Sequence, residues 1–340
     1  MGNLNTAIRY LPSAGRNVEV RDLSKQFLEK DNAEFLAAVA TDLRDKARSA
    51  AFGPYLDPEG RGCIGLIGEY GLIGYTIRRA QELIRVDHGP SYWSHAYLHA
   101  GGFSTDARVN RDPGRSPWIW ESTLEPATLF NRFTDRNGVG PRRFADYARA
   151  DFDFFAPHSV PNIAVLAIGM TEKERAAVLD RADDADVDQL NYDIAGLLGV
   201  WYLYVTNRAE QRNPLGAGTA VFCSAYVQLA YDAAGIDLAP GAHQRNTAPE
   251  HLWQTVRYLG SRVSRLPASS TSAEARRAPR GARTRRIVTP LADRPVLGWY
   301  CVRDKACVLA PVDLDEKLKA PRRLTEAIAL AESREKGRKR

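Results

Sequence analysis

The chain has 340 residues, of which 44% are hydrophobic and 26% are charged, a balance typical of a soluble globular protein with a substantial core. No apolar run is long enough to cross a bilayer, so we expect no transmembrane segment. The four cysteines are too few for a disulfide framework and do not have the spacing of metal ligands, so we expect a reduced setting without a metal or cofactor.

The net charge of +6 is concentrated in one segment. Residues 261–286 contain eight arginines and one acidic residue, a net charge of +7, which leaves −1 for the rest of the chain. This stretch is also rich in Ser, Ala and Pro, so we predict a disordered linker at 261–295. The run from Arg262 to Arg286 could bind nucleic acid or an anionic membrane weakly, by charge alone. It lacks the interleaved aromatic residues that sequence-specific RNA recognition uses.

Hydrophobic periodicity, glycines and prolines predict the elements in chain order. The apolar residues of 21–52 recur at helical spacing, and a loop rich in glycine and proline follows at 53–62. Strands are predicted at 63–68, 92–102, 118–123 and 162–169. Helices are predicted at 71–86, 171–182, 191–205, 219–235, 247–256 and 324–340. Residues 296–311 are predicted to form a hairpin that turns at Arg303–Lys305.

These elements divide the chain into four predicted regions. They are an N-terminal helical extension (1–59), a catalytic domain (60–260), the linker (261–295), and a C-terminal hairpin and helix (296–340).

Cys223 is the cysteine best placed for chemistry. A cysteine reacts as its thiolate, and the dipole at a helix N-terminus stabilises that anion. Cys223 lies in the first turn of the predicted 219–235 helix, and the glycine-rich segment NPLGAGTA before it would let a substrate approach. A cysteine beside a phenylalanine in a helix is also a common core residue. Cys223 alone therefore leaves both interpretations open.

A thiol nucleophile needs a base and a polar group that orients the base. His95 and His99 lie in the strand YWSHAYLHAG and share one face, because strand side chains alternate. The two could share one site, or one could orient the other. Glu121 lies between tryptophans in WIWES, where a carboxylate needs a partner. A histidine on a neighbouring strand would supply that partner; an edge-strand carboxylate facing water is the alternative.

Six motifs follow one another in a specific order: CIGLIGEYG, WSHAYLH, WIWEST, NYDIAG, FCSAYVQLAYDAAGIDL and TAPEHL. Together they resemble the permuted NlpC-like cysteine hydrolases, the YiiX/YebB-like branch of the papain-like superfamily, over about residues 60–256. Two positions depart from the pattern. The aspartate of the family's opening GDI is absent from RGCIG, and Ala225–Tyr226 stand where the family has glutamate.

The resemblance implies an α+β protein with a circularly permuted papain-like fold. A small antiparallel sheet would pack on helices, here with a helical N-terminal and a basic C-terminal extension. The resemblance implies that Cys223 is the nucleophile, His95 the base and Glu121 the residue that orients the base. His99 is the alternative third catalytic member.

The resemblance also points to substrate contacts. Tyr192 and Asp193 match the YD motif of the family, and Tyr192 would line the cleft. Ser224 follows the nucleophile and Trp93 precedes the histidine, and we expect both to contact substrate. The backbone N–H of Cys223 is a candidate donor to an oxyanion.

Three functions are consistent with these residues. The first is a thiol hydrolase, a peptidase or amidase, that cleaves an amide through an acyl-enzyme on Cys223. The second is an acyltransferase or thioesterase that acts on lipid or acyl substrates. The third is a catalytically silent interaction protein that binds anionic partners through the 261–286 arginine run.

The N-terminus bears on localisation. Residues MGNLNTAIRY lack the apolar core of a signal peptide, so the default expectation is a cytoplasmic protein. A secreted effector without a signal peptide is an alternative. MGNLNT also fits the N-myristoylation pattern at Gly2, although one acyl chain anchors a protein only marginally.

Overall fold

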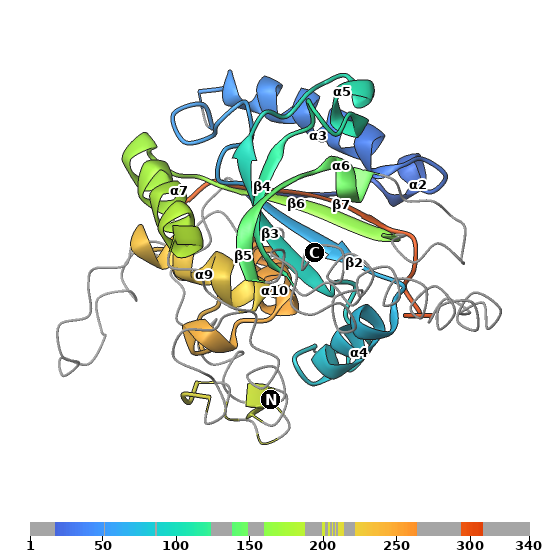
Figure 1. Ribbon diagram of the computed structural model, residues 1–340, viewed down its shortest axis with the longest axis vertical. Coiled ribbons are helices and arrows are strands. Elements are labelled where there is room, and N and C mark those ends of the chain that lie inside the picture. The colour runs from blue at the N-terminus through green and yellow to red at the C-terminus, as the bar shows by residue number, and fades with distance from the viewer. Residues whose placement is uncertain are drawn as a thin grey trace, which may run out of the picture.

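The computed structural model places the central part of the chain on one mixed sheet (Figure 1). The described residues are 18–50, 52–85, 87–123, 138–148, 160–187, 199–200, 203–204, 206, 208, 210–213, 222–263 and 294–308. Within them, seven strands run in the order β1-β7-β6-β2-β3-β4-β5. The strands are β1 (Val18–Asp22), β2 (Ile64–Gly68), β3 (His95–Gly101), β4 (Trp118–Thr123), β5 (Gly138–Arg143), β6 (Asn162–Ile168) and β7 (Val296–Val302).

Neighbouring strands are antiparallel except for β1 and β7, which are parallel. The helices are α2 (Ser24–Phe27), α3 (Asn32–Ala47), α4 (Leu72–Ala80), α5 (Ala107–Arg111), α6 (Ala145–Ala148), α7 (Glu172–Val187), α9 (Cys223–Ala233) and α10 (Pro249–Val263). Two short 3-10 helices are η1 (Gln81–Leu83) and η3 (Gln244–Asn246). None of the helices among the described residues is both long and apolar enough to span a bilayer.

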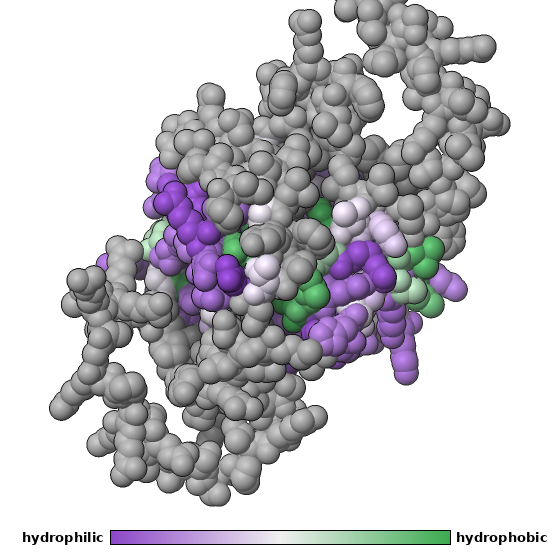
Figure 2. Space-filling view, turned by 90° about the horizontal axis from the view of Figure 1, so that it is seen from below, coloured by the Kyte–Doolittle hydropathy of each residue, from purple (hydrophilic) through white to green (hydrophobic). Residues whose placement is uncertain are grey.

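Helices cover both faces of the sheet, which explains why the inner strand β6 is buried along its whole length (Figure 1). Ile163 and Val165 pack on the side of α3, together with Phe35 of that helix. The alternating residues, such as Leu166, face the other core with α9 and α10, where Tyr226 is buried. The described surface seen in Figure 2 is mainly hydrophilic, with apolar residues in small separate groups.

The mixed α and β composition agrees with the predicted class, but the sheet is larger than the predicted small antiparallel sheet. Strand β1 and helix α3 come from the predicted N-terminal extension, and β7 comes from the predicted C-terminal region. Because β7 pairs with both β1 and β6, these regions belong to the same sheet as the predicted catalytic domain.

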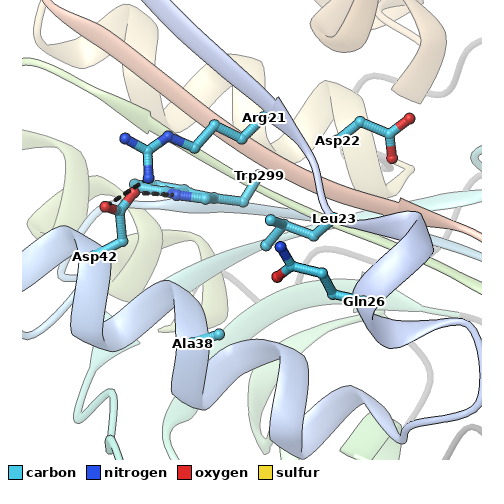
Figure 3. Close-up of a pocket in the computed structure, with 7 residues that line it drawn as sticks. All are labelled: Arg21, Asp22, Leu23, Gln26, Ala38, Asp42 and Trp299. Atoms are coloured by element: carbon cyan, nitrogen blue, oxygen red, sulfur yellow. Dashed lines mark hydrogen bonds and ion pairs between the residues drawn. The ribbon is translucent and has the colours of Figure 1, made fainter.

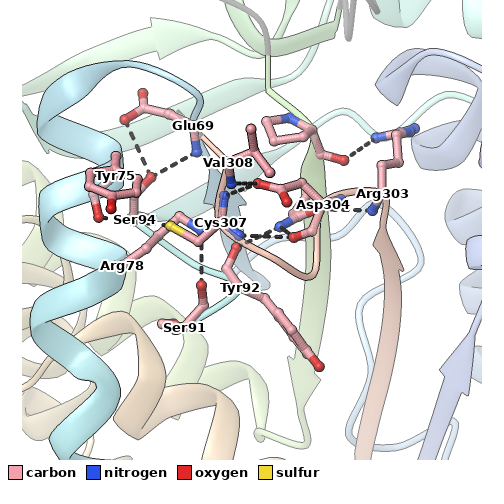
Figure 4. A network of polar contacts seen from close by, with 12 residues as sticks. Glu69, Tyr75, Arg78, Ser91, Tyr92, Ser94, Arg303, Asp304, Cys307 and Val308 are labelled. Atoms are coloured by element: carbon pink, nitrogen blue, oxygen red, sulfur yellow. Dashed lines mark hydrogen bonds and ion pairs between the residues drawn. The ribbon is translucent and has the colours of Figure 1, made fainter. Parts of the chain in front are cut away.

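Of the hairpin predicted at 296–311, the described residues form only the first arm, which is β7. Residues 309–311 lie outside the described part, and residues 303–308 after β7 form no strand. Instead they enter a buried polar network (Figure 4). Asp304 pairs with Arg78 of α4 at 2.8 Å, and Asn162 Oδ1 accepts from the backbone N–H groups of Arg303 and Asp304, each at 2.9 Å.

Several predictions lie outside the described residues. These are Gly2, Tyr192 and Asp193, most of the 191–205 helix, the arginine run from 264 onward, and the 324–340 helix.

Candidate active site

Helix α9 begins at Cys223, four residues later than predicted, so the thiol is on its first residue. The residue before it, Phe222, is extended and has no side-chain oxygen to cap the helix. The first intrahelical bond runs from Tyr226 N to Phe222 O at 2.9 Å. The N–H groups of the first turn, that of Cys223 included, therefore have no partner within the helix and are directed toward the space before it.

Strand β3 begins at His95, which is buried beside the start of α9. The His95 side chain is hydrogen-bonded to Glu121, and Cys223 is near enough to influence its pKa. Its Nε2 lies 2.7 Å from Glu121 Oε2, which leaves Nδ1 as the ring nitrogen for the thiol. Helix α9 packs across β3 and β4, and this packing brings together three residues that are far apart in sequence.

Glu121 is 0% exposed, and several neighbouring side chains donate hydrogen bonds to its carboxylate. Arg142 Nε of β5 lies 2.8 Å from Oε1. The Tyr147 hydroxyl of α6 donates to Oε2 at 3.1 Å and reaches Oε1 at 3.3 Å. With His95 on Oε2, both carboxylate oxygens are satisfied, so burial is compatible with an ionised group. The alternative of an edge carboxylate facing water is wrong, because β4 lies between β3 and β5.

The electrostatic environment favours the charged forms of His95 and Glu121. Burial disfavours the imidazolium, but the charges of Cys223 and Glu121 and the hydrogen bonds to them raise the pKa of His95 well above its usual value. Burial likewise pushes the pKa of Glu121 up, yet the hydrogen bond and charge of His95, with Arg142 and Tyr147, bring it below its usual value. The environment thus favours His95 as a cation beside the ionised carboxylate of Glu121.

The structure does not bring His99 into this group. It lies on the same face of β3 as His95, as predicted, but Tyr97 stands between them. Its ring is packed against Phe103, with centroids 4.5 Å apart, and neither nitrogen has a hydrogen-bond partner within the described part of the chain. Burial lowers the pKa of His99 to about 3, so it is neutral. Glu121, not His99, occupies the third position.

Two predicted substrate contacts need correction. Trp93 is 0% exposed and packs on Trp253 in the α9 and α10 core, so it has no surface to offer a substrate. The Ser224 hydroxyl is buried and donates to Thr247 O at 2.6 Å, so it tethers α9 to the chain before α10. The third predicted contact, Tyr192, lies outside the described residues.

Arg142 and Tyr147 were not identified by the sequence patterns. They lie on β5 and α6, and the sequence GVGPRR of β5 contains a proline and two glycines that weaken a strand pattern. Two adjacent arginines usually indicate an exposed surface. The sequence signal for these two donors was Glu121 itself, because a carboxylate in an apolar strand needs hydrogen-bond donors.

A pocket of about 480 Å³ lies at the other edge of the sheet (Figure 3). It is lined by Arg21, Asp22, Leu23, Gln26, Ala38, Asp42 and Trp299. Asp42 already accepts from Trp299 Nε1 at 2.6 Å and from Arg21 at 2.8 Å. The pocket is separated from β3 and β4 by several strands and contains neither the thiol nor its base. Among the described residues, no group of His, Cys, Asp and Glu side chains is arranged to hold a metal ion.

No protein-family model, no curated protein and no solved structure matches this chain.

Proposed function

We propose that the chain is a thiol hydrolase that cleaves an amide through an acyl-enzyme on Cys223. The observation that carries this proposal is one histidine that is hydrogen-bonded to a buried carboxylate and lies within electrostatic range of a thiol at a helix start. This is the arrangement of nucleophile, base and orienting group that thiol-based acyl transfer requires.

The proposed reaction has two steps. With the thiol proton already on His95, the Cys223 sulfur attacks the amide carbonyl, whose oxygen takes up the negative charge. The uncapped N–H of Cys223 is positioned to donate to that oxygen. The C–N bond then breaks, and His95 returns the proton to the departing amine. Water, deprotonated by His95, attacks the thioester and releases the acid and the free thiol.

The acyltransferase or thioesterase alternative shares the first half of this reaction and differs in the substrate. Trp93, the aromatic residue expected to contact substrate, is fully buried and offers no surface to an acyl chain. The third alternative rests on the arginine run, of which 264–286 lies outside the described residues. The amide hydrolase is therefore the function we favour.

The proposal predicts that Cys223 is far more reactive than the other three cysteines at mildly acidic pH. The four thiols are all buried, and Cys223 and Cys307 are 3% and 4% exposed, so access is comparable. Burial raises the pKa of Cys63 to about 12 and also raises the pKa values of Cys301 and Cys307. At pH 6 we expect iodoacetamide to alkylate Cys223 at least about tenfold faster than Cys307.

Peptide mass spectrometry of the alkylated protein over time measures the four rates. His95→Ala should bring the Cys223 rate down to that of Cys307, whereas Cys63→Ala should leave it unchanged. Equal rates for Cys223 and Cys307 in the unmodified sequence, or no effect of His95→Ala, would contradict the proposal.

A further inference from the structure

Strand β5 and helix α6 supply two donors to Glu121 in addition to His95. His95 occupies Oε2, and Arg142 Nε contacts Oε1 at 2.8 Å. Tyr147 touches both oxygens, and its ring stacks on Tyr97 with centroids 5.8 Å apart and planes within 5°. The plane of the carboxylate is therefore fixed from both sides, with one oxygen held toward His95.

Glu121 is fully buried, and an ionised carboxylate in such a place is costly unless positive charges lie close to it. The imidazolium of His95 contacts one carboxylate oxygen, and the guanidinium of Arg142, whose side chain is 15% exposed, contacts the other.

The carboxylate of Glu121 stabilises the proton on the His95 imidazolium. A guanidinium bound to that carboxylate is expected to weaken this effect. A base must both accept and release its proton during the reaction, so a carboxylate that held the proton too strongly would slow the return step. An arginine behind the carboxylate weakens that hold without removing the hydrogen bond.

We propose that Arg142 is a positioning residue that holds ionised Glu121 against His95 and limits how strongly His95 retains its proton. The assignment deepens the proposed function, since it depends on His95 being the base of that reaction. Arg142 contacts Glu121 at 2.8 Å, so the effect we propose on His95 passes through that carboxylate.

Nuclear magnetic resonance of the full chain labelled at histidine tests this proposal. The chain has six histidines, so the His95 signal can be assigned by its loss in His95→Gln. We expect Arg142→Gln to raise the titration midpoint of His95 by about one pH unit, because it removes a nearby positive charge. Arg142→Lys keeps the charge and should return the midpoint to within about 0.3 units of the original.

Arg143→Gln is the matched control. Arg143 is the next residue on β5, but its guanidinium lies 3.7 Å from the centre of the Trp118 ring and donates to Ser116 O. Because successive side chains of a strand alternate, its substitution should leave the His95 midpoint where it is. If Arg142→Gln fails to fold, Arg142→Met, which keeps the apolar stem, takes its place with the same expected rise.

The outcomes separate this proposal from the proposed function. Cys223→Ala should lower the His95 midpoint, since the sulfur charge raises it. If the His95 midpoint falls with Cys223→Ala but does not rise with Arg142→Gln, the role of Arg142 is overturned and the proposed function is not. No change with Cys223→Ala contradicts the thiol–imidazole pair, and hence the proposed function, whatever Arg142 does. A rise of equal size with Arg143→Gln also overturns the proposal, because the effect would then not pass through Glu121.

Discussion

At the scale of single residues, the contact between His95 and Glu121 depends on burial and charge together. Each group alone would lose its charge in the protein interior. As a pair they reinforce each other, with the Nε2–Oε2 distance of 2.7 Å and further donors on the carboxylate. The two residues therefore form a buried ion pair within the sheet. His95 of this pair is also the proposed catalytic base.

This pair makes stability depend on pH in a defined window. His95 has a raised pKa, so its contribution is complete below about pH 6.5 and is lost as the pH rises through the folded value. Glu121 has a lowered pKa, so its contribution is present above about pH 4.5 and is lost as the pH falls through the folded value. The pair therefore stabilises most between about pH 4.5 and 6.5.

We expect Glu121→Gln to lower the free energy of unfolding by about 3–5 kcal/mol in that window, because it leaves a buried cation with a neutral partner. The loss should shrink at both lower and higher pH. Urea unfolding across a pH series measures it. Glu82→Gln, which removes a carboxylate from the exposed pair with Arg79, should cost less than about 1 kcal/mol. A loss that is the same at every pH would contradict the pairing.

At the scale of elements, the site depends on how strands β2, β3 and β4 fit side by side. Gly65 of β2 pairs directly with Tyr97 of β3, and the Tyr97 ring lies flat over the glycine. Tyr147 stacks on the other side of that ring and reaches Glu121. The glycine thus makes room for the aromatic layer that supports the carboxylate.

Gly65→Ala should therefore destabilise the protein by about 1–3 kcal/mol, because the added Cβ would overlap the buried Tyr97 ring. Thermal unfolding measures the change. Gly114→Ala is the control: Gly114 is exposed, and its added Cβ would come no nearer than 3.4 Å to the described atoms around it. We expect a change within about 0.5 kcal/mol there. Equal effects of the two substitutions would show that Tyr97 has room to move.

At the scale of the whole molecule, segments from both ends of the chain complete the sheet. Strand β7 lies between β1 and β6, more than a hundred residues away from either in sequence. The chain after β7 is held by the network around Arg78, which also donates to Ser91 O at 2.8 Å (Figure 4). Ser91 lies four residues before His95, so this network joins the C-terminal strand to the segment that leads into the site.

We expect Arg78→Met to destabilise the protein by about 3–5 kcal/mol, because Asp304 would be left as an unpaired buried charge. Arg79→Met, on the next residue of the same helix, breaks only the exposed pair with Glu82 and should cost less than about 1 kcal/mol. Urea unfolding of both variants at pH 7 compares them. A small effect of Arg78→Met would mean that water reaches Asp304.

The sequence predicted the individual elements better than their arrangement. Strands β2, β3, β4 and β6 and helices α7, α9 and α10 lie close to their predicted ranges, and Pro249 is the first residue of α10, as expected. Strands β1 and β5 were not predicted. Both are edge strands of five or six residues with charged or proline positions, so neither has a clear apolar alternation.

For the site, sequence alone identified Cys223, His95 and Glu121 as candidates, because each is a reactive or polar group in an apolar pattern that needs a partner. Only the tertiary structure decided which of them meet. In the folded protein Glu121, and not His99, contacts His95. Arg142 and Tyr147 come to Glu121 from a segment that the sequence did not predict. Trp93 is buried in the core. The physical reason is that local periodicity reports whether a segment is buried, whereas the identity of its neighbours depends on contacts between residues far apart in the chain.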